Sequence, residues 1–423
     1  MKLEILSIGT ELLLGQTLNT NSAWLSLELA KIGVDVFFHT TVGDNPARIK
    51  EALSLACARS NEVILTGGLG PTEDDVTCRS VAEFAEKKLI FHSSILKKIR
   101  GHFLRRRIPM PKLNERQAYL PEGADEVSNP VGTAPGFILE ISRKNGDGSD
   151  FPPFFLIALP GVPREMKPMF EQSIRPFLLN QMPQKEVLII RTLRTTGLAE
   201  STIAQQIKRW LKLKPPLTVG IYAKLREVDV RIMAKAKNPS RALKMIHRVE
   251  NQIKPKLKGV LFGADEQTLE ETVVRTLIAK RKTLAVAESC TGGLLANRLT
   301  NVSGSSKTLQ LGWVLYSNRE KAKILNIPED ILKKQGAVSQ PVAILMAQRV
   351  RELSQTNYGI GITGIAGPSG GTKEKPVGLV YIALANPTKT QCQKNHFSGN
   401  REEIKWQATQ AALDMIRRYF VPS

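Results

Sequence analysis

Residues 1–172 alternate between strand and helix patterns. Apolar runs typical of buried strands are separated by stretches with helical spacing of apolar positions, and two later apolar runs flank a turn-rich segment that suits a hairpin tip. The strand runs are 3–9, 34–43, 62–68, 136–142 and 154–159, the helical stretches 20–33 and 45–60, and the turn-rich segment 143–153. This order predicts a parallel sheet with helices on both faces.

Residues 173–265 have a different pattern. Two runs that alternate apolar and polar residues, 217–225 and 227–236, predict strands with one exposed face. Helical spacing at 200–212 and 239–257 adds two helices. We expect a small α+β module here.

Residues 266–423 return to alternating helix and strand, with a final helix from Glu402. Strands are expected at 282–289, 312–318, 358–364 and 377–385, and helices at 268–281, 293–300 and 341–353. The fold class expected for the chain is therefore α/β. Two α/β domains, 1–172 and 266–423, are joined by the α+β module.

Composition narrows the class of protein. The 423 residues exceed one ordinary core, and 42% hydrophobic with 23% charged residues is typical of a soluble globular protein. No apolar run is long enough to span a membrane, and Glu4 and Glu11 make the first residues a buried strand rather than a signal peptide. The four cysteines show no CxxC spacing, which disfavours zinc and disulfide frameworks and fits a reducing cytoplasm.

The net charge of +21 is concentrated in the middle module, where residues 173–265 hold 19 Lys and Arg against 6 Asp and Glu. Such a surface can bind nucleic acid or can be a solvated face. The lack of interleaved aromatic residues favours the solvated face.

A first group of polar residues follows the predicted strands of residues 1–172. In an open α/β sheet, the carboxyl ends of the strands form the ligand crevice. The group comprises Thr10, Glu11, Asn21, Asp44, Gly67, Gly68, Gly70, Thr72, Asp74 and Asp75. Glycines let backbone N–H groups approach an anion, and Asp44, Asp74 and Asp75 are candidate ligands for Mg²⁺ or a similar divalent ion beside it. The alternative is a Gly-Pro turn followed by an Asp helix cap.

A second group surrounds residues 287–293, which read AESCTGG. Strand, sharp turn and helix follow one another here, with the helix expected to begin near Gly292. Helix N–H groups at such a turn can hold an oxyanion or a phosphate. The alternative is a helix capped by Ser or Thr. Of the three adjacent nucleophiles we expect Ser289 to attack, Cys290 to point into the apolar layer and Thr291 to cap the helix.

Residues elsewhere in 266–423 supply other parts that acyl transfer requires. Tyr316 and Lys321 are candidate proton acceptors for Ser289, and a second glycine-rich strand end lies at 362–371. A serine β-lactamase-like enzyme would need Lys three residues after the serine, but Gly292 stands there. That class is therefore excluded.

The N-terminal motifs resemble the competence/damage-inducible CinA family. GTELLLGQ (9–16), TVGDN (41–45), TGGLGPTEDDVT (66–77), GTAPGF (132–137) and LPGVPREM (159–166) carry the resemblance. It implies a molybdopterin-binding-like domain that, in some members, is a metal-dependent ADP-ribose pyrophosphatase. ADP-ribose is then the expected substrate, attacked by water with the help of a divalent ion.

The C-terminal motifs AESCTGG, YSNREKAKIL (316–325), QGAVSQ (335–340), TGIAGPSGGTKEKPVG (363–378) and FSGNREEI (397–404) are similar to the C-terminal CinA domain. The resemblance implies deamidation of nicotinamide mononucleotide (NMN), with no cofactor. It assigns the nucleophile to Ser289 and further active-site roles to Tyr316, Thr363 and Arg401, of which Arg401 is expected to pair with the nucleotide phosphate. Expected substrate-binding positions are Glu288, Thr291, Gly292, Gly293, Asn318, Gly364 and Gly367. Lys405 departs from the family, which often has a second Arg there.

The middle segment resembles the KH-like linker of the family, yet it lacks the GXXG loop with which KH domains grip nucleic acid. We therefore expect no specific nucleic-acid partner and no membrane partner, and a spacer or dimer scaffold in a homodimer. Three functions stay open: a two-site hydrolase of pyridine-nucleotide salvage, a chain with one active site beside a nucleotide- or cofactor-binding domain, and a DNA-associated competence factor.

Overall fold

The computed structural model describes residues 2–144, 150–181 and 187–420. Contacts divide the chain into two compact units, 1–189 with 235–243, and 190–234 with 244–423. The expected hairpin tip at 143–153 lies partly outside the described residues, although its two strands pair as predicted.

The N-terminal domain is a six-stranded sheet in the order β2-β1-β3-β8-β7-β6. The strands β2, β1, β3 and β8 are parallel, as expected, and β7 and β6 extend the sheet with antiparallel pairs. The strands are β1 (Lys2–Ile8), β2 (Asp35–Val42), β3 (Glu62–Thr66), β4 (Leu89–Phe91), β5 (Tyr119–Pro121), β6 (Asp125–Val127), β7 (Gly136–Lys144) and β8 (Asp150–Leu159), of which β4 and β5 form a separate pair.

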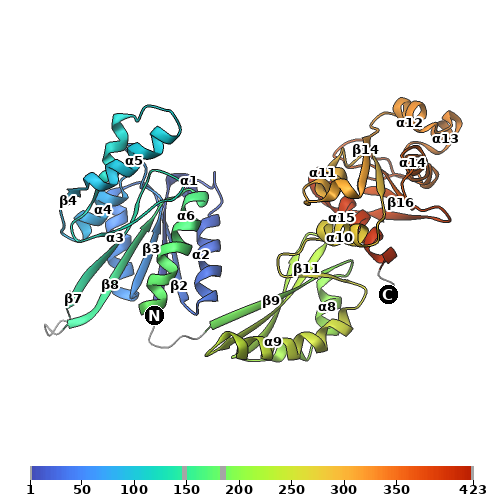
Figure 1. The fold of residues 1–423 in the computed structure, drawn as a ribbon. Helices are drawn as coiled ribbons and strands as arrows, with labels where there is room; N and C mark the ends of the chain where they lie inside the picture. The colour runs from blue at the N-terminus through green and yellow to red at the C-terminus, as the bar shows by residue number, and fades with distance from the viewer. Residues whose placement is uncertain (1, 145–149, 182–186, 421–423) are drawn as a thin grey trace. The chain divides into compact units, whose positions relative to one another are not determined.

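Helices cover both faces of this sheet, as the sequence predicted (Figure 1). They are α1 (Thr10–Leu13), α2 (Thr20–Lys31), α3 (Pro46–Arg59), α4 (Thr77–Phe84), α5 (Ser93–Arg105), α6 (Pro163–Met169) and α7 (Arg175–Gln181). Strand β3 is buried along its whole length because successive side chains face opposite cores. Val63 and Leu65 pack toward α3, α4 and α5, whereas Ile64 packs toward α2, α6 and α7.

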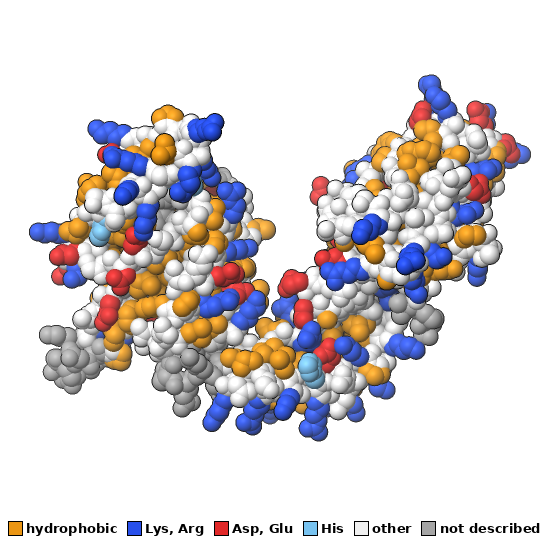
Figure 2. Space-filling model, in the orientation of Figure 1, with side chains coloured by type: hydrophobic (Ala, Val, Ile, Leu, Met, Phe, Trp, Pro, Cys, Tyr) orange, Lys and Arg blue, Asp and Glu red, His pale blue; other side chains and the backbone are white. Residues whose placement is uncertain are grey.

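The middle module is a four-stranded sheet, β10-β11-β9-β12, with two helices. Its elements are β9 (Val187–Thr196), α8 (Glu200–Gln206), β10 (Leu217–Lys224), β11 (Glu227–Ala236), α9 (Pro239–Ile253) and β12 (Leu261–Ala264). The helix expected over 200–212 ends at Gln206, and a short 3-10 turn at Trp210–Lys212 follows. Lys and Arg side chains gather along the edge formed by α9 (Figure 2).

The C-terminal domain has a five-stranded sheet in the order β14-β13-β15-β16-β17. Its strands are β13 (Leu284–Glu288), β14 (Leu309–Val314), β15 (Tyr358–Gly364), β16 (Leu379–Ala385) and β17 (Thr390–His396). Its helices are α10 (Leu269–Ala279), α11 (Leu294–Thr300), α12 (Asn318–Leu325), α13 (Glu329–Gln335), α14 (Gln340–Leu353) and α15 (Arg401–Phe420). In β13, Leu284 and Val286 face the core with α10, α11 and α15, and Ala285 and Ala287 face the core with α12 to α14.

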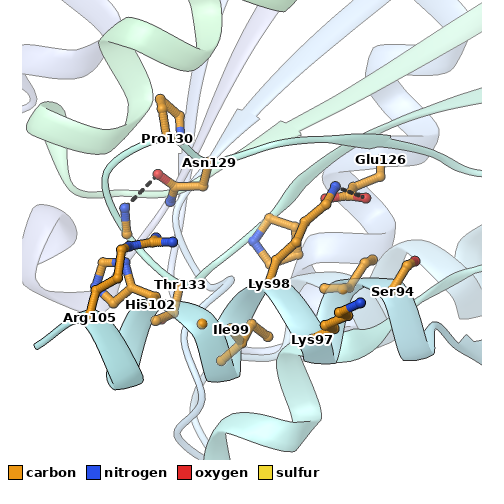
Figure 3. A pocket seen from close by; sticks show the side chains of 14 residues that line it. Ser94, Lys97, Lys98, Ile99, His102, Arg105, Glu126, Asn129, Pro130 and Thr133 are labelled. Atoms are coloured by element: carbon orange, nitrogen blue, oxygen red, sulfur yellow. Dashed lines mark hydrogen bonds and ion pairs between the residues drawn. The ribbon is translucent and has the colours of Figure 1, made fainter. Parts of the chain in front are cut away.

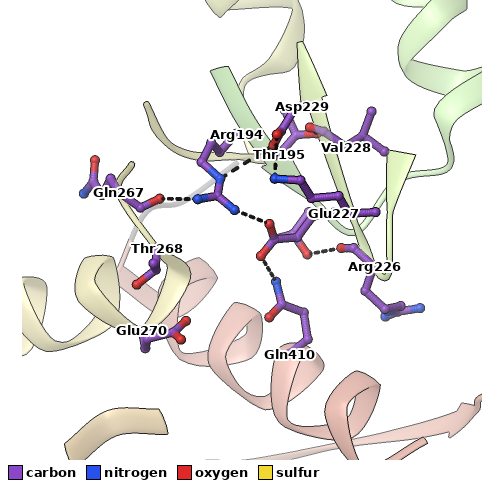
Figure 4. A network of polar contacts seen from close by, with 12 residues as sticks. Arg194, Thr195, Arg226, Glu227, Val228, Asp229, Gln267, Thr268, Glu270 and Gln410 are labelled. Carbon is purple, nitrogen blue, oxygen red and sulfur yellow. Dashed lines mark hydrogen bonds and ion pairs between the residues drawn. The ribbon is translucent and has the colours of Figure 1, made fainter. Parts of the chain in front are cut away.

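A polar network joins the middle module to the C-terminal domain within the second unit (Figure 4). Arg194 on β9 forms an ion pair of 2.7 Å with Glu227 on β11, and Gln410 on α15 donates to the same carboxylate at 2.8 Å. Gln410 also accepts from the buried Arg298 of α11, at 2.7 Å. The network therefore connects the middle module to α11, which follows the AESCTGG turn, and to α15, which begins at Arg401.

Within the described ranges, no helix has the length and apolar character needed to cross a bilayer.

Candidate active sites

The first cluster of predicted residues lines one cavity at the carboxyl ends of β1, β2, β3 and β8. The cavity has a volume of about 580 Å³. Its wall includes the predicted residues Glu11, Asp44, Gly67, Gly68, Gly70, Asp74 and Asp75. The expected sheet edge and the expected site therefore coincide.

Two threonines fix two of the cavity's carboxylates. Thr10 donates from its backbone N–H and from its hydroxyl to Asp44 Oδ2, each at 2.8 Å. Thr72 donates in the same way to Asp75 Oδ2, at 2.9 and 2.5 Å. The second carboxylate oxygens of Asp44 and Asp75 accept no hydrogen bond from another described residue, whereas a hydrogen bond from Thr72 also reaches the exposed Asp74 and lowers its pKa. Thr10 and Thr72 thus act through the aspartates they hold.

The glycine-rich turn after β3 packs closely against the end of β1. Gly67 has φ +107°, and a Cβ there would stand 2.1 Å from the carbonyl oxygen of Ile8. Among the described residues, none accepts a hydrogen bond from the backbone N–H groups of Gly68, Leu69 or Gly70. Three adjacent N–H groups beside a cavity form a cradle for phosphate oxygens.

The alternative interpretation of this turn, an Asp helix cap, is not what the structure shows. Helix α4 has Val76 at its N-cap position and no side-chain cap. Neither Asp74 nor Asp75 therefore caps the N-terminus of α4. Asn21 differs from expectation in another way, because its amide donates to the carbonyl oxygen of Gly161 at 2.7 Å and so holds the loop that forms one cavity wall.

The donor set of this cavity fits a hard divalent cation that enters with its substrate. Carboxylates of Glu11, Asp44, Asp74, Asp75 and Glu165 all line the same space. In the described part of the chain, no three His, Cys, Asp or Glu side chains form a ready-made metal-ligand group. Mg²⁺ is commonly held by one or two carboxylates together with waters and substrate phosphates, so such an incomplete protein shell suits it. Glu165, which reaches the cavity from α6, is not among the site residues predicted from the sequence.

The second cluster is built on the turn between β13 and α11. Glu288, the last residue of β13, is fully buried. Its carboxylate accepts from the backbone N–H groups of Gly293, Leu295 and Ala296 at 2.8–3.1 Å. Glu288, predicted to bind substrate, therefore occupies the N-terminus of α11 and holds the turn rigid.

The ammonium group of Lys321 contacts the hydroxyl of Ser289. Lys321 lies in the first turn of α12, and its Nζ stands 3.0 Å from Ser289 Oγ and 2.9 Å from the carbonyl oxygen of Leu315. Lys321 is 1% exposed and Ser289 8%. Burial lowers the pKa of Lys321, because the charged amine loses its hydration. The site therefore pairs a serine with an amine that gives up its proton more readily than an exposed lysine does.

Cys290 and Thr291 are not arranged to attack. Cys290 packs in the core between the sheet and α10, α11 and α15, as predicted, and burial raises the pKa of its thiol to about 12. The prediction that Thr291 caps the helix is wrong. The helix begins at Leu294, its N-cap residue is Gly293, and Glu288 takes the N–H groups of its first turn. Thr291 is fully buried, and its hydroxyl has no partner in the described chain.

Tyr316 and Arg401 meet each other at the rim of this site. Tyr316, which lies beyond the end of β14 rather than in a strand, accepts from Arg401 Nη2 at 2.8 Å. Arg401 also donates from Nη1 to the carbonyl oxygen of Gly367 at 2.5 Å. Tyr316 is 64% exposed. Of the two predicted proton acceptors, Lys321 contacts Ser289, and Tyr316 instead contacts Arg401.

The remaining predicted residues frame the site. Thr363, buried at the end of β15, donates to the carbonyl oxygen of Ala337 at 2.8 Å and so anchors the QGAVSQ loop. Gly364 ends β15, and Asn318 is the exposed first residue of α12. Lys405 Nζ lies 3.6 Å from the position that a Cβ on Gly292 would take. No hydrogen bond or ion pair links Lys405 to another described residue. Lys405 is far from Gly292 in the sequence, and the fold brings its charge to the turn at Gly292.

Family models match three successive parts of the chain. Residues 4–180 match a probable molybdopterin binding domain, residues 190–263 the KH domain of damage-inducible protein CinA, and residues 266–420 the CinA C-terminal domain.

Full-length relatives agree with the family models. The chain is 46% identical over 418 residues to a CinA-like protein of Dictyoglomus thermophilum, and 43% identical over 421 residues to a putative competence-damage inducible protein of Caldicellulosiruptor bescii. These alignments cover 99% and 100% of both chains, respectively. A crystal structure of a competence/damage inducible protein from Agrobacterium tumefaciens is 35% identical, covers 35% of this chain and 94% of its own, and has a TM-score of 0.34.

Fold and comparisons together define a mixed α/β protein with a molybdopterin-binding-like domain, a KH-like module and a CinA C-terminal domain. The chain belongs to the CinA family.

Proposed function

We propose that the chain is a hydrolase with two active sites. The C-terminal site hydrolyses NMN to nicotinate mononucleotide and ammonia, and the N-terminal site hydrolyses ADP-ribose to AMP and ribose 5-phosphate. The main support is the buried 3.0 Å contact between Lys321 Nζ and Ser289 Oγ. A nucleophile beside an amine with a lowered pKa is the pairing that acyl transfer needs.

Acylation begins with neutral Lys321. Its amine takes the Ser289 proton as Ser289 Oγ bonds to the carboxamide carbon, and the carbonyl oxygen becomes an oxyanion. The backbone N–H groups of Cys290 and Thr291 donate to no other described residue, so they are the candidate oxyanion donors. One such donor contributes roughly 10²–10³ in rate. The carbon–nitrogen bond then breaks, and Lys321 returns the proton to the departing ammonia.

Deacylation uses the same groups in a second cycle. Water attacks the Ser289 ester and gives a proton to Lys321. As the tetrahedral intermediate collapses, Lys321 returns this proton to Ser289 Oγ. The carboxylic acid that forms gives the second proton of the water to solvent and leaves as nicotinate mononucleotide. Because Leu315 O also accepts from Lys321 Nζ, the amine stays aimed at the serine in both half-reactions.

Lys405 is the candidate contact for the substrate phosphate. Arg401, given this role by family resemblance, already bonds with Gly367 and Tyr316. Lys405 stands one turn further along α15, beside Gly292, and its charge has no partner among the described residues. An ammonium group binds phosphate as a point charge rather than as a fork.

At the N-terminal site, the residues of the chain bind and orient a pyrophosphate. The N–H groups after Gly67 cradle phosphate oxygens, and Thr10 and Thr72 hold Asp44 and Asp75 at the cavity. A divalent ion bound there would neutralise phosphate charge and lower the pKa of the attacking water.

Offering NMN and ADP-ribose separately tests both halves of the proposal. Ser289→Ala should abolish NMN deamidation and keep ADP-ribose hydrolysis, and Asp75→Asn should do the reverse. Ammonia release and AMP formation are the two readouts, with Mg²⁺ present throughout. Loss of both activities in either variant would contradict the assignment of separate sites. Deamidation by Ser289→Ala would exclude Ser289 as the nucleophile.

A further inference from the structure

A second cavity adjoins the N-terminal site and has no role in the function proposed above. It lies between α5 and the loop that precedes β7, and its volume is about 510 Å³ (Figure 3). Thr133 lines both this α5 pocket and the cavity of the active site. A volume of this size is enough for a sugar phosphate or a larger group.

Hydrogen bonds of Asn129 hold the loop that lies between the two cavities. Asn129 Oδ1 accepts from the backbone N–H groups of Val131 and Gly132 at 3.0 and 2.7 Å. Its amide donates to Ala134 O at 2.9 Å and to Glu165 Oε2 at 2.7 Å. A Cβ on Gly132 would stand 2.1 Å from the Glu165 carboxylate, so a side chain there would displace Glu165. One asparagine therefore connects the wall of the α5 pocket to a carboxylate of the active-site cavity.

The α5 pocket carries an excess of positive charge. Lys97, Lys98, His102 and Arg105 line it from α5, and the only acid among the described residues of its lining, Glu126, is paired with Lys98 at 2.8 Å. Lys97 and Arg105 make no hydrogen bond or ion pair with any residue in the described part of the chain. Burial lowers the pKa of His102, and the charges of Arg106 and Arg105 lower it further against an opposing effect of Glu165, so the positive charge of the pocket comes from the lysines and Arg105. An anion is the ligand that such a field attracts.

The chemistry of Arg105 narrows the class of anion. Figure 3 shows Arg105 and His102 at one end of the pocket, below the loop that carries Asn129 and Pro130. A guanidinium group presents a fork of N–H donors that matches two oxygens of a phosphate. The nucleotide proposed for the neighbouring active-site cavity already places its pyrophosphate at the backbone N–H groups that follow Gly67. A phosphate in the α5 pocket must then be an additional one.

We propose that the α5 pocket is a subsite for a phosphomonoester that a nucleotide carries in addition to its pyrophosphate, with Arg105 as the main contact. The inference rests on the proposed pyrophosphatase function and adds a substrate class to it. Nucleotides of the ADP-ribose type that carry a further phosphomonoester are preferred over those without it, and a phosphate on the adenosine ribose is the version that the following experiments use.

Binding of two small probes to the full chain tests this subsite without any turnover. Adenosine 2′,5′-bisphosphate and AMP differ by one phosphomonoester, and titration calorimetry gives both dissociation constants. We expect the parent to bind the bisphosphate about tenfold more tightly, which is the usual size of one hydrogen-bonded charge pair. Arg105→Ala and Lys97→Ala should each reduce this preference, with Arg105→Ala abolishing most of it.

Arg100→Ala is the matched control. It removes the same charge from α5, but Arg100 faces Glu115 at 3.5 Å and does not line the pocket. The preference should survive this change. Equal affinity of the parent for both probes, persistence of the preference in Arg105→Ala, or its equal loss in Arg100→Ala would each overturn the subsite.

Hydrolysis assays separate failure of the subsite from failure of the proposed function. Arg105→Ala should hydrolyse ADP-ribose within about twofold of the parent, and should lose about tenfold in kcat/KM only on the 2′-phosphorylated substrate. If the parent hydrolyses neither substrate, the pyrophosphatase proposal is wrong, and the preference measured by calorimetry still decides whether the pocket binds the extra phosphate. A parent that hydrolyses both substrates equally well, with equal probe affinities, refutes the subsite alone.

Discussion

Replacing Lys321 with Met should remove catalysis without unfolding the C-terminal domain. Lys321 is the buried residue that contacts the nucleophile, and Met has a similar length but no proton to transfer. A positioned general base contributes about 10²–10⁴ in rate. We therefore expect kcat/KM for NMN to fall by that factor. In Lys321→Arg, kcat/KM for NMN should fall by the same factor, because a guanidinium group stays charged and cannot accept the serine proton.

The same substitution has a calculable effect on stability. Lys321→Met would leave Leu315 O and Ser289 Oγ without a donor, at a cost of about 1 kcal/mol for each lost hydrogen bond. Against this, the parent must bury an amine whose pKa burial lowers, and each unit of lowering destabilises the fold by about 1.4 kcal/mol while the amine is charged. The two effects have opposite signs, so they offset each other in part. The net change in unfolding free energy should therefore be smaller than the loss of the two hydrogen bonds alone.

The pH dependence of the unfolding free energy shows whether the charge of Lys321 stabilises or destabilises the fold. The folded chain releases the Lys321 proton at a lower pH than the unfolded chain does, because the folded pKa is lowered. Between the two pKa values the unfolded state holds more protons, so the stability of the parent rises with pH. The penalty is complete below the folded pKa and is gone above the unfolded value of about 10.4. Relative to the parent, Lys321→Met should therefore be most stable at low pH and lose this advantage as pH rises.

Activity should follow the same ionisation. Only the neutral amine can accept the serine proton, so kcat/KM of the parent should rise with pH through the lowered pKa of Lys321. Lys323→Met, an exposed change on the same helix, is the control and should leave both the pH profile and the rate unchanged. A Lys321→Met enzyme that keeps more than about a tenth of the activity would show that another base, such as Tyr316, accepts the proton.

Three further changes test other parts of the structure. Cys290→Ala should keep most NMN deamidation, and a loss of more than about tenfold would mean that the thiol takes part in the chemistry. Gly67→Ala should destabilise the N-terminal domain by at least about 2 kcal/mol in urea unfolding, because its Cβ would stand 2.1 Å from Ile8 O at a φ of +107°. Thr291→Val should leave stability unchanged or raise it by about 1 kcal/mol, since the buried hydroxyl has no partner in the described chain, and a clear loss would reveal a hydrogen bond that the structure lacks.

Much of the architecture follows from hydrophobic periodicity. Strand β3 and strand β13 are short apolar runs that end in glycine-rich turns, and both lie in the middle of their sheets as such runs should. Strand β17, Thr390–His396, was missed because it is an edge strand with polar residues at nearly every position. Its pairing is set by β16 beside it, and such a tertiary effect leaves no pattern in the sequence.

The sequence located both candidate sites and named Lys321 as one of two candidate proton acceptors for Ser289, but it did not choose between Lys321 and Tyr316. Strand ends bring Asp44 and Asp75 to one cavity, and that much follows from the parallel sheet. The contact between Ser289 and Lys321 joins residues 32 positions apart. The rule for helix caps failed at Thr291 for a related reason. That rule considers residues beside the helix start, whereas the acceptor used is Glu288, which reaches from the end of β13 to the N–H groups of Gly293, Leu295 and Ala296.

The cap formed by Glu288 also explains why the serine, rather than the more reactive cysteine next to it, is the residue suited to attack. With Glu288 fixed in the helix terminus, Ser289 faces Lys321 and Cys290 is turned into the core. There, burial is the main reason why the thiol pKa is raised to about 12. The nearby Glu288 contributes to the rise, and the backbone hydrogen bond of Cys290, Lys321 and Arg401 oppose it without cancelling it. At neutral pH only about one thiol in 10⁵ would be ionised. The intrinsic advantage of sulfur depends on the thiolate, so it is lost here, while the serine needs only the amine that stands 3.0 Å away.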